Sequence, residues 1–164
     1  MNKKIIIVIV VLIATVSVSG CIKTPLDNVN DVIPSLTESI EKGSLNYNES
    51  VQYTNKRDYS TAEEKIQQAN TNFLDAQNKI LDIKEYYNNI NDTLYIQYLN
   101  LIESELNLKQ NATANLQLAI QAFSTGNKVL ANDYVNKANS NMKEAVSIQK
   151  QRENLVKNNP SKFK

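Results

Sequence analysis

The chemistry open to this chain is narrow, because its 164 residues include one cysteine, Cys21, and no histidine or tryptophan. Without histidine it lacks the usual general base at neutral pH and the commonest transition-metal ligand. A single cysteine cannot form an internal disulfide or a thiolate zinc site. The sequence also contains no Glu-x-x-His pair and no glycine-rich phosphate loop. We therefore expect no enzymatic activity, no cofactor and no metal, which leaves the Cys21 thiol as the group to explain.

The residues before Cys21 are arranged as in a secretory signal peptide. A short basic start, residues 1–4, precedes an almost unbroken apolar run over residues 5–18, and the small residues Ser19 and Gly20 follow. Small residues give a peptidase access to the bond that it cuts. The apolar run falls short of the about 20 residues that a transmembrane helix needs. The pattern predicts export from the cytoplasm and cleavage between Gly20 and Cys21.

The segment Val18-Ser19-Gly20-Cys21 resembles the lipobox of prokaryotic lipoproteins, with valine in place of the more frequent leucine. The resemblance covers only the leader. It implies that the Cys21 thiol receives a diacylglyceryl group and becomes the new N-terminus, which makes membrane lipid a partner and anchors the chain to the outer face of the cell membrane. The alternative is an uncleaved anchor helix with an incidental cysteine. The composition, rich in asparagine and isoleucine, would fit an archaeal source.

Charge and hydropathy indicate that the chain after Cys21 forms a single helical domain. Removing residues 1–20 leaves 16 basic against 17 acidic residues, a balance that gives no long-range attraction for nucleic acid. Apolar residues recur at steps of four and three from Ala62 to Tyr87, a seam at heptad spacing. Ser60 predicts the start of that helix, Asp92 the N-cap of the next, and Gly126 a left-handed cap at its end. The first helix is the weakest, and we expect it to fray or kink near Gly43.

We predict an all-α fold, an antiparallel up-down helical bundle of four long helices formed by two tandem hairpins. The predicted parts are the signal peptide (1–20), the lipidated cysteine with a short polar tether (21–30), the bundle (31–157) and a basic tail (158–164).

The chain also repeats itself at an offset of 69 residues. Ala62, Ala69 and Ala76 correspond to Ala131, Ala138 and Ala145 without a gap. Duplication of a hairpin and a shared heptad constraint both explain this agreement. About a dozen residues from Asp58 resemble the second helix of a tetratricopeptide repeat, but the helices look too long for that family and no 34-residue period appears.

The up-down topology sorts candidate contact residues between two ends of the bundle. With Cys21 at the membrane, the turn near residues 88–91 and the C-terminus lie near the lipid, and the turns near 57 and 127 lie far from it. Candidates for membrane contact are Tyr86, Tyr95, Lys162 and Phe163, since tyrosine and lysine favour the headgroup zone. Candidates for a distal partner are Arg57, Tyr59, Asn127 and Lys128. Core packing and solvated turns explain the same residues.

Two further features concern modification and binding. Asn48, Asn91 and Asn111 each begin an Asn-x-Ser/Thr sequon, although chance predicts a similar number in so asparagine-rich a chain. Lys109 and Thr113 interrupt an apolar row, and they either line a polar cavity or face solvent where the row narrows.

Two functions fit these observations. The first is a non-enzymatic cell-envelope lipoprotein whose helical module is structural or binds an envelope protein. The alternative is an extracytoplasmic sensory bundle that binds a small ligand between its helices. A solid core favours the first, and a cavity containing Lys109 favours the second.

Overall fold

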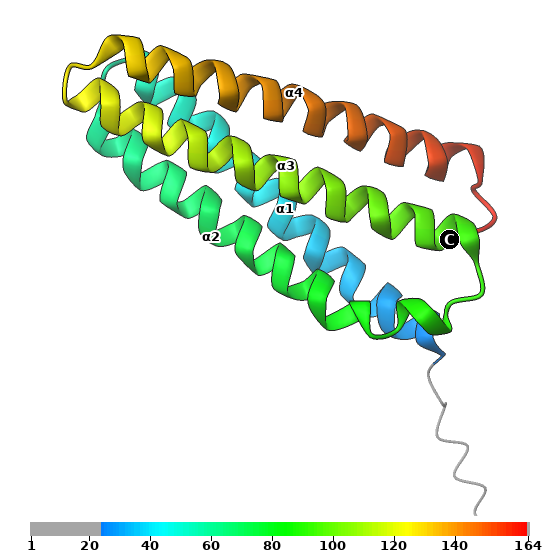
Figure 1. Ribbon diagram of the computed structural model, residues 1–164. Coiled ribbons are helices and arrows are strands. Elements are labelled where there is room, and N and C mark those ends of the chain that lie inside the picture. Colours follow the sequence, from blue (N-terminus) through cyan, green and yellow to red (C-terminus); the bar gives the residue numbers. More distant parts are fainter. Residues whose placement is uncertain (1–23, 164) are drawn as a thin grey trace, which may run out of the picture.

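The computed structural model describes residues 24–163, which form an antiparallel bundle of four long helices (Figure 1). The helices are α1 (Pro25–Asn55), α2 (Tyr59–Lys84), α3 (Thr93–Ser124) and α4 (Lys128–Asn158), with the short 3-10 helix η1 (Tyr87–Asn89) between α2 and α3. The closest packing is between α1 and α2 and between α3 and α4. The predicted all-α bundle of two tandem hairpins is therefore confirmed.

Helix α1 begins earlier than expected. Thr24 and Asp27 form a reciprocal capping box, in which the Thr24 side chain accepts from the Asp27 N–H and the Asp27 side chain accepts from the Thr24 N–H. Pro25 occupies the first helical turn, where its missing N–H leaves no hydrogen bond unmade. The part of the predicted tether from Pro25 to Asn30 is consequently helical.

Helix α1 also passes through Gly43 without interruption, so the expected fraying does not occur. Gly43 is buried, and a Cβ placed there would lie 2.5 Å from Cε1 of Phe73. The ring of Phe73 is fully buried in this space. The packing of an aromatic ring offsets the low helix propensity of glycine.

The turns at the far end of the two hairpins have the same construction. Arg57 (φ 63°) and Gly126 (φ 81°) both adopt the left-handed conformation, and each is followed by a residue whose side chain caps the next helix. Their N–H groups donate to Thr54 and Phe123, and the following N–H groups donate to Tyr53 and Ala122, as in a Schellman motif. Gly126 thus has the predicted role, whereas the cap of α2 is Asp58 and not Ser60. The predicted cap Asp92 accepts from the N–H groups of Leu94 and Tyr95.

The four helices do not close evenly around one core. Helix α2 lies between α1 and α3, and it buries seven apolar residues: Ala62, Ile66, Ala69, Phe73, Ala76, Ile80 and Ile83. Helix α4 packs mainly on α3 and buries only Ala131, Ala138 and Ala145. The backbones of α1 and α4 do not approach each other closely. The bundle is therefore open along one side.

Candidate functional site: the groove between α1 and α4

Three pockets follow one another along this open side, and we call them together the α1/α4 groove. Each is lined by residues of α1, α3 and α4. The pocket nearest the start of α1 has a volume of about 330 Å³ and includes Tyr95, Tyr98 and Phe163. The distal pocket, also about 330 Å³, includes Tyr47 and Phe123. The middle pocket, about 460 Å³, lies in the size range of small-molecule sites.

The middle pocket contains a buried charge cluster formed by Glu105, Lys109 and Arg152, which we call the buried triad. Oε1 of Glu105 lies 2.9 Å from Nζ of Lys109, one helical turn away on α3, outside hydrogen-bond geometry. Nε of Arg152, on α4, donates to Oε2 of Glu105 at 3.1 Å. The exposed fractions of the three side chains are 0%, 4% and 14%. Charges so little exposed are rare unless they are paired, and one carboxylate here pairs with two cations.

Neighbouring side chains hold the two cations in place. Nζ of Lys109 donates to Oγ of Ser44 on α1 at 2.9 Å, so the triad connects three helices. The guanidinium of Arg152 lies 5.9 Å from the centre of the Tyr98 ring, a cation–π contact. These contacts fix the positions of both charges along the groove.

The charges of the middle pocket are not balanced within the triad. Two cations share one carboxylate, and the two Nη groups of Arg152 have no hydrogen-bond partner among residues 24–163. Two further carboxylates, Glu41 and Glu153, line the exposed side of the pocket. Within the described part of the chain neither forms an ion pair, and Glu153 accepts one hydrogen bond, from Gln149. The pocket therefore presents positive charge inside and negative charge at its rim.

Of the two residues singled out from the sequence, Lys109 lines the pocket and Thr113 is buried beside it in the core. Neither faces solvent. The Thr113 hydroxyl donates to the Lys109 carbonyl within the helix. Glu105 and Arg152 were not predicted, because their spacing of 47 residues matches no motif. The 69-residue offset could have identified them, since it aligns the triad with residues 36, 40 and 83, which are leucine, isoleucine and isoleucine.

Three of the four residues predicted to meet the membrane, Tyr95, Lys162 and Phe163, lie together around one pocket of the protein. Tyr95 is buried, its hydroxyl donates to Asn30, and its ring lies 5.3 Å from that of Phe163. Nζ of Lys162 donates to Oδ2 of Asp92 at 2.7 Å and holds the pKa of that carboxyl below its usual range. Tyr86 is half-buried at the edge of the core. The C-terminal segment thus packs on the start of α3, and lipid contact stays a prediction.

The predicted distal residues lie at the opposite end of the bundle from the start of α1 (Figure 1). Arg57, Asn127 and Lys128 are exposed, whereas the half-buried ring of Tyr59 stacks on Phe123 at 6.0 Å. Val129, on the first turn of α4, is 84% exposed. This end therefore combines free charge with an exposed apolar side chain.

The remaining predicted positions concern modification. Asn48, Asn91 and Asn111 are all exposed, and Asn48 lines the middle pocket. Gly20 and Cys21 lie outside the described residues. Between residues 24 and 163, no group of three or more candidate ligands is placed to hold a metal ion. No helix in that range is long and apolar enough to cross a membrane.

Comparison with known proteins gives no relative from which to transfer a role. No family model matches the chain, and neither a curated protein nor a solved structure matches it.

Proposed function

We propose that this protein is a non-enzymatic, lipid-anchored binding module of the cell envelope, and that the α1/α4 groove is its binding site. Of the two functions that fit the sequence, small-ligand binding now has the stronger support. The observation that carries it is the buried triad in a pocket of about 460 Å³ that contains Lys109. A module that only spaces or supports other proteins has no need of charges buried beside an open cavity.

The anchor and the groove fit together geometrically. Helix α1 begins at Pro25, four residues after Cys21. Even fully extended, that distance is at most about 14 Å, so a lipid on Cys21 would hold the bundle close to the bilayer. The groove would then extend away from the membrane surface, accessible to solutes outside the cell.

Export and lipidation are tested by intact mass and detergent partitioning of the membrane-expressed protein, with Cys21→Ala beside the wild type. We expect the wild type to lose residues 1–20, gain lipid mass and enter the detergent phase. The variant should show none of these changes. If both proteins keep Met1 and stay in the membrane, the leader is a transmembrane anchor.

Ligand binding is tested by native mass spectrometry of the full-length protein, purified in detergent and incubated with small-molecule extract from its host. The groove is blocked by Asn48→Trp, and the matched control is Asn78→Trp, at an exposed position of α2 that lines none of the three groove pockets. A bound mass that is lost only in Asn48→Trp supports the groove as the site. A mass retained in both variants, or absent from the wild type, contradicts it.

A protein-binding role is the second candidate, and one observation favours it. The side chains of Val129 and Leu130 are 84% and 42% exposed, and they form an apolar patch at the distal end, next to Lys128. Val129→Ser would weaken capture of an envelope protein without changing ligand binding in the groove. Cross-linking in intact envelopes, with wild type and variant side by side, separates the two roles.

A further inference from the structure

We infer that the middle pocket of the α1/α4 groove binds a free α-amino acid with an apolar side chain. Its carboxylate would lie against Lys109 and Arg152, and its ammonium group against Glu41 and Glu153. This inference rests on the proposed function, because it names the ligand of the same groove.

The carboxylate subsite follows from the unbalanced charge of the buried triad. Glu105 neutralises one of the two cations and leaves one positive charge in a largely buried position. The Nη groups of Arg152 make no hydrogen bond within the described chain, and they are the donors that pair with carboxylates in two parallel bonds. Ser44 and Tyr98 already hold the two cations, so little ordering is required on binding.

The ammonium subsite follows from the rim. Glu41 and Glu153 line the same pocket from α1 and α4, and neither has an ion-pair partner among the described residues. With them, the lining carries three carboxylates against two cations. That balance disfavours phosphates and other polyanions, and it suits a ligand that has one charge of each sign.

The remaining lining suits an apolar side chain. Ile40 and Leu45 of α1 border the pocket, and Leu45 is 60% exposed. A pocket of about 460 Å³ accommodates an amino acid of the size of leucine.

The fold itself does not require the triad. At the 69-residue offset, Glu105, Lys109 and Arg152 correspond to Leu36, Ile40 and Ile83, which are all buried in the first hairpin. The same helix geometry is thus satisfied by apolar side chains in one hairpin, and by charges only where a pocket is present. A buried ion cluster is often no more stabilising than apolar residues of similar volume, so stability alone is a weak reason to retain it.

Calorimetric titration of the full-length protein in detergent tests this inference with three probes. L-leucine has both charges, 4-methylpentanoate lacks the ammonium group, and 3-methylbutylamine lacks the carboxylate. We expect L-leucine to bind, and each of the other two to bind at least about tenfold more weakly, since each loses a charge-assisted interaction.

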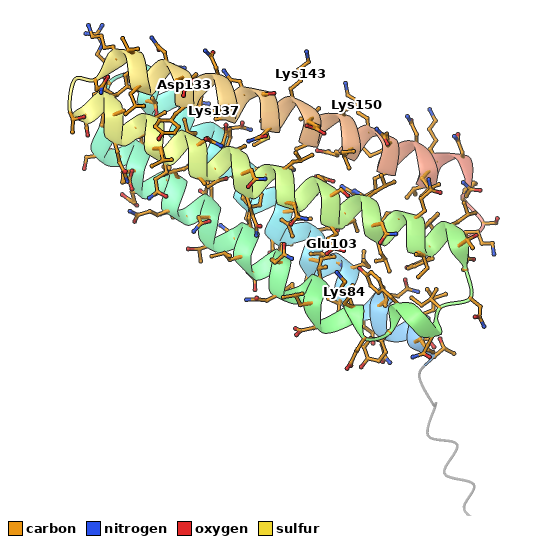
Figure 2. The ribbon with its side chains drawn as sticks, in the orientation of Figure 1. Lys84, Glu103, Asp133, Lys137, Lys143 and Lys150 are labelled. Carbon is orange, nitrogen blue, oxygen red and sulfur yellow. The ribbon has the colours of Figure 1, made fainter. Side chains whose placement is uncertain are left out.

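Variants locate the two charges of the ligand. In the double variant Glu41→Gln, Glu153→Gln, the affinity for L-leucine should be no higher than that for 4-methylpentanoate. The triple variant Glu105→Leu, Lys109→Ile, Arg152→Ile introduces the apolar residues found at the equivalent positions of the first hairpin. It should keep its helical circular dichroism spectrum but lose L-leucine binding. If it does not fold, Arg152→Gln tests the same subsite. Lys143→Gln, on the outer face of α4 where Figure 2 shows Lys143 pointing away from the bundle, is the control and should bind normally.

Each of the following results would overturn the inference. Equal binding of L-leucine and 4-methylpentanoate would exclude the ammonium subsite, and undiminished binding by the triple variant or Arg152→Gln would exclude the carboxylate subsite. A different molecule bound in the groove, with no L-leucine binding, would overturn the ligand class but leave the proposed function standing. If nothing in the host extract binds either, both fail.

Discussion

The two hairpins of this bundle have nearly the same backbone design but different interiors. Helices α1 and α3 end 69 residues apart, at Asn55 and Ser124, and α2 and α4 begin 69 residues apart, at Tyr59 and Lys128. Alanines occupy equivalent buried positions of α2 and α4. Yet the first hairpin is apolar at positions where the second contains the buried triad. Similar backbones can therefore support either a closed core or a charged pocket.

The difference follows from the neighbours of each helix. Because α2 packs against both α1 and α3, its positions Ile80 and Ile83 are buried. Their counterparts on α4 are Gln149 and Arg152, which face the side where α1 and α4 do not meet. Figure 2 shows the contrast at the surface: Lys84 and Glu103 lie together between α2 and α3, whereas Lys143 and Lys150 of α4 point outward. An uncovered helix side is what makes room for the pocket.

The largest expected effect comes from removing the carboxylate of the triad while both of its cations remain. Glu105→Leu leaves Lys109 and Arg152 without their common carboxylate, and it should lower the free energy of unfolding by about 3–5 kcal/mol. The triple variant with the first hairpin's residues should recover most of that loss, because no buried charge remains. Urea denaturation of the two variants measures the difference. A single variant as stable as the triple one would contradict the pairing described here.

A second contrast concerns Tyr47, whose counterpart at the 69-residue offset is Leu116. Burial raises the pKa of Tyr47 from 10.0 to about 12. The folded protein then holds this proton more tightly than the unfolded chain, so the contribution is complete below pH 10 and is lost as the pH rises through about 12. The loss for Tyr47 is about 2–3 kcal/mol, at about 1.4 kcal/mol for each unit of pKa shift.

Tyr47→Phe is the matched control for this pH dependence. Urea denaturation between pH 9 and 12 should show a smaller fall in unfolding free energy for the variant than for the wild type. Some fall should remain, because burial also raises the pKa of Tyr87 to about 12. Identical curves for the two proteins would mean that the Tyr47 hydroxyl is not shielded from water.

A third contrast concerns the paired positions Gly43 and Ala112. Gly43→Ala places a methyl group within 2.5 Å of the buried Phe73 ring, and we expect it to destabilise the protein by about 1–3 kcal/mol. This is the reverse of the usual gain from replacing a glycine inside a helix. Ala112→Gly, the reciprocal change, should cost about 2 kcal/mol, because it lowers helix propensity and removes a fully buried methyl group. Thermal unfolding compares the two, and a stabilised Gly43→Ala would show that Phe73 can move aside.

Sequence patterns predicted the structural features that depend on residues close together in the chain. The heptad seam identified the buried face of α2, and Asp92 and Gly126 were recognised as caps because capping involves residues within one turn. The early start of α1 was missed because Pro25 was interpreted as part of a tether, although Thr24 and Asp27 form a capping box around it.

Contacts between helices were harder to predict. The role of Gly43 depends on Phe73, thirty positions later, and that of Glu105 on Arg152, 47 residues away. Heptad spacing shows which face of a helix is apolar, but not which helix covers it or leaves it open. The triad therefore could not be predicted from spacing within α3, although the register between the two hairpins contains the information.

The smallest contrast is between the two distal turns, where Arg57 and Gly126 have the same left-handed conformation. A side chain in this conformation costs about 1 kcal/mol, whereas glycine adopts it freely. Arg57→Gly should therefore raise the unfolding free energy by up to about 1 kcal/mol, and Gly126→Arg should lower it by a similar amount, as thermal unfolding would measure. A Cβ at Gly126 would have no atom within 4 Å outside the two neighbouring residues, so a side chain there is not crowded. Backbone strain alone should therefore decide the stability change, with opposite signs in the two variants. If Arg57→Gly destabilised the protein instead, the entropy that glycine adds to the unfolded chain would outweigh the strain relieved in the turn.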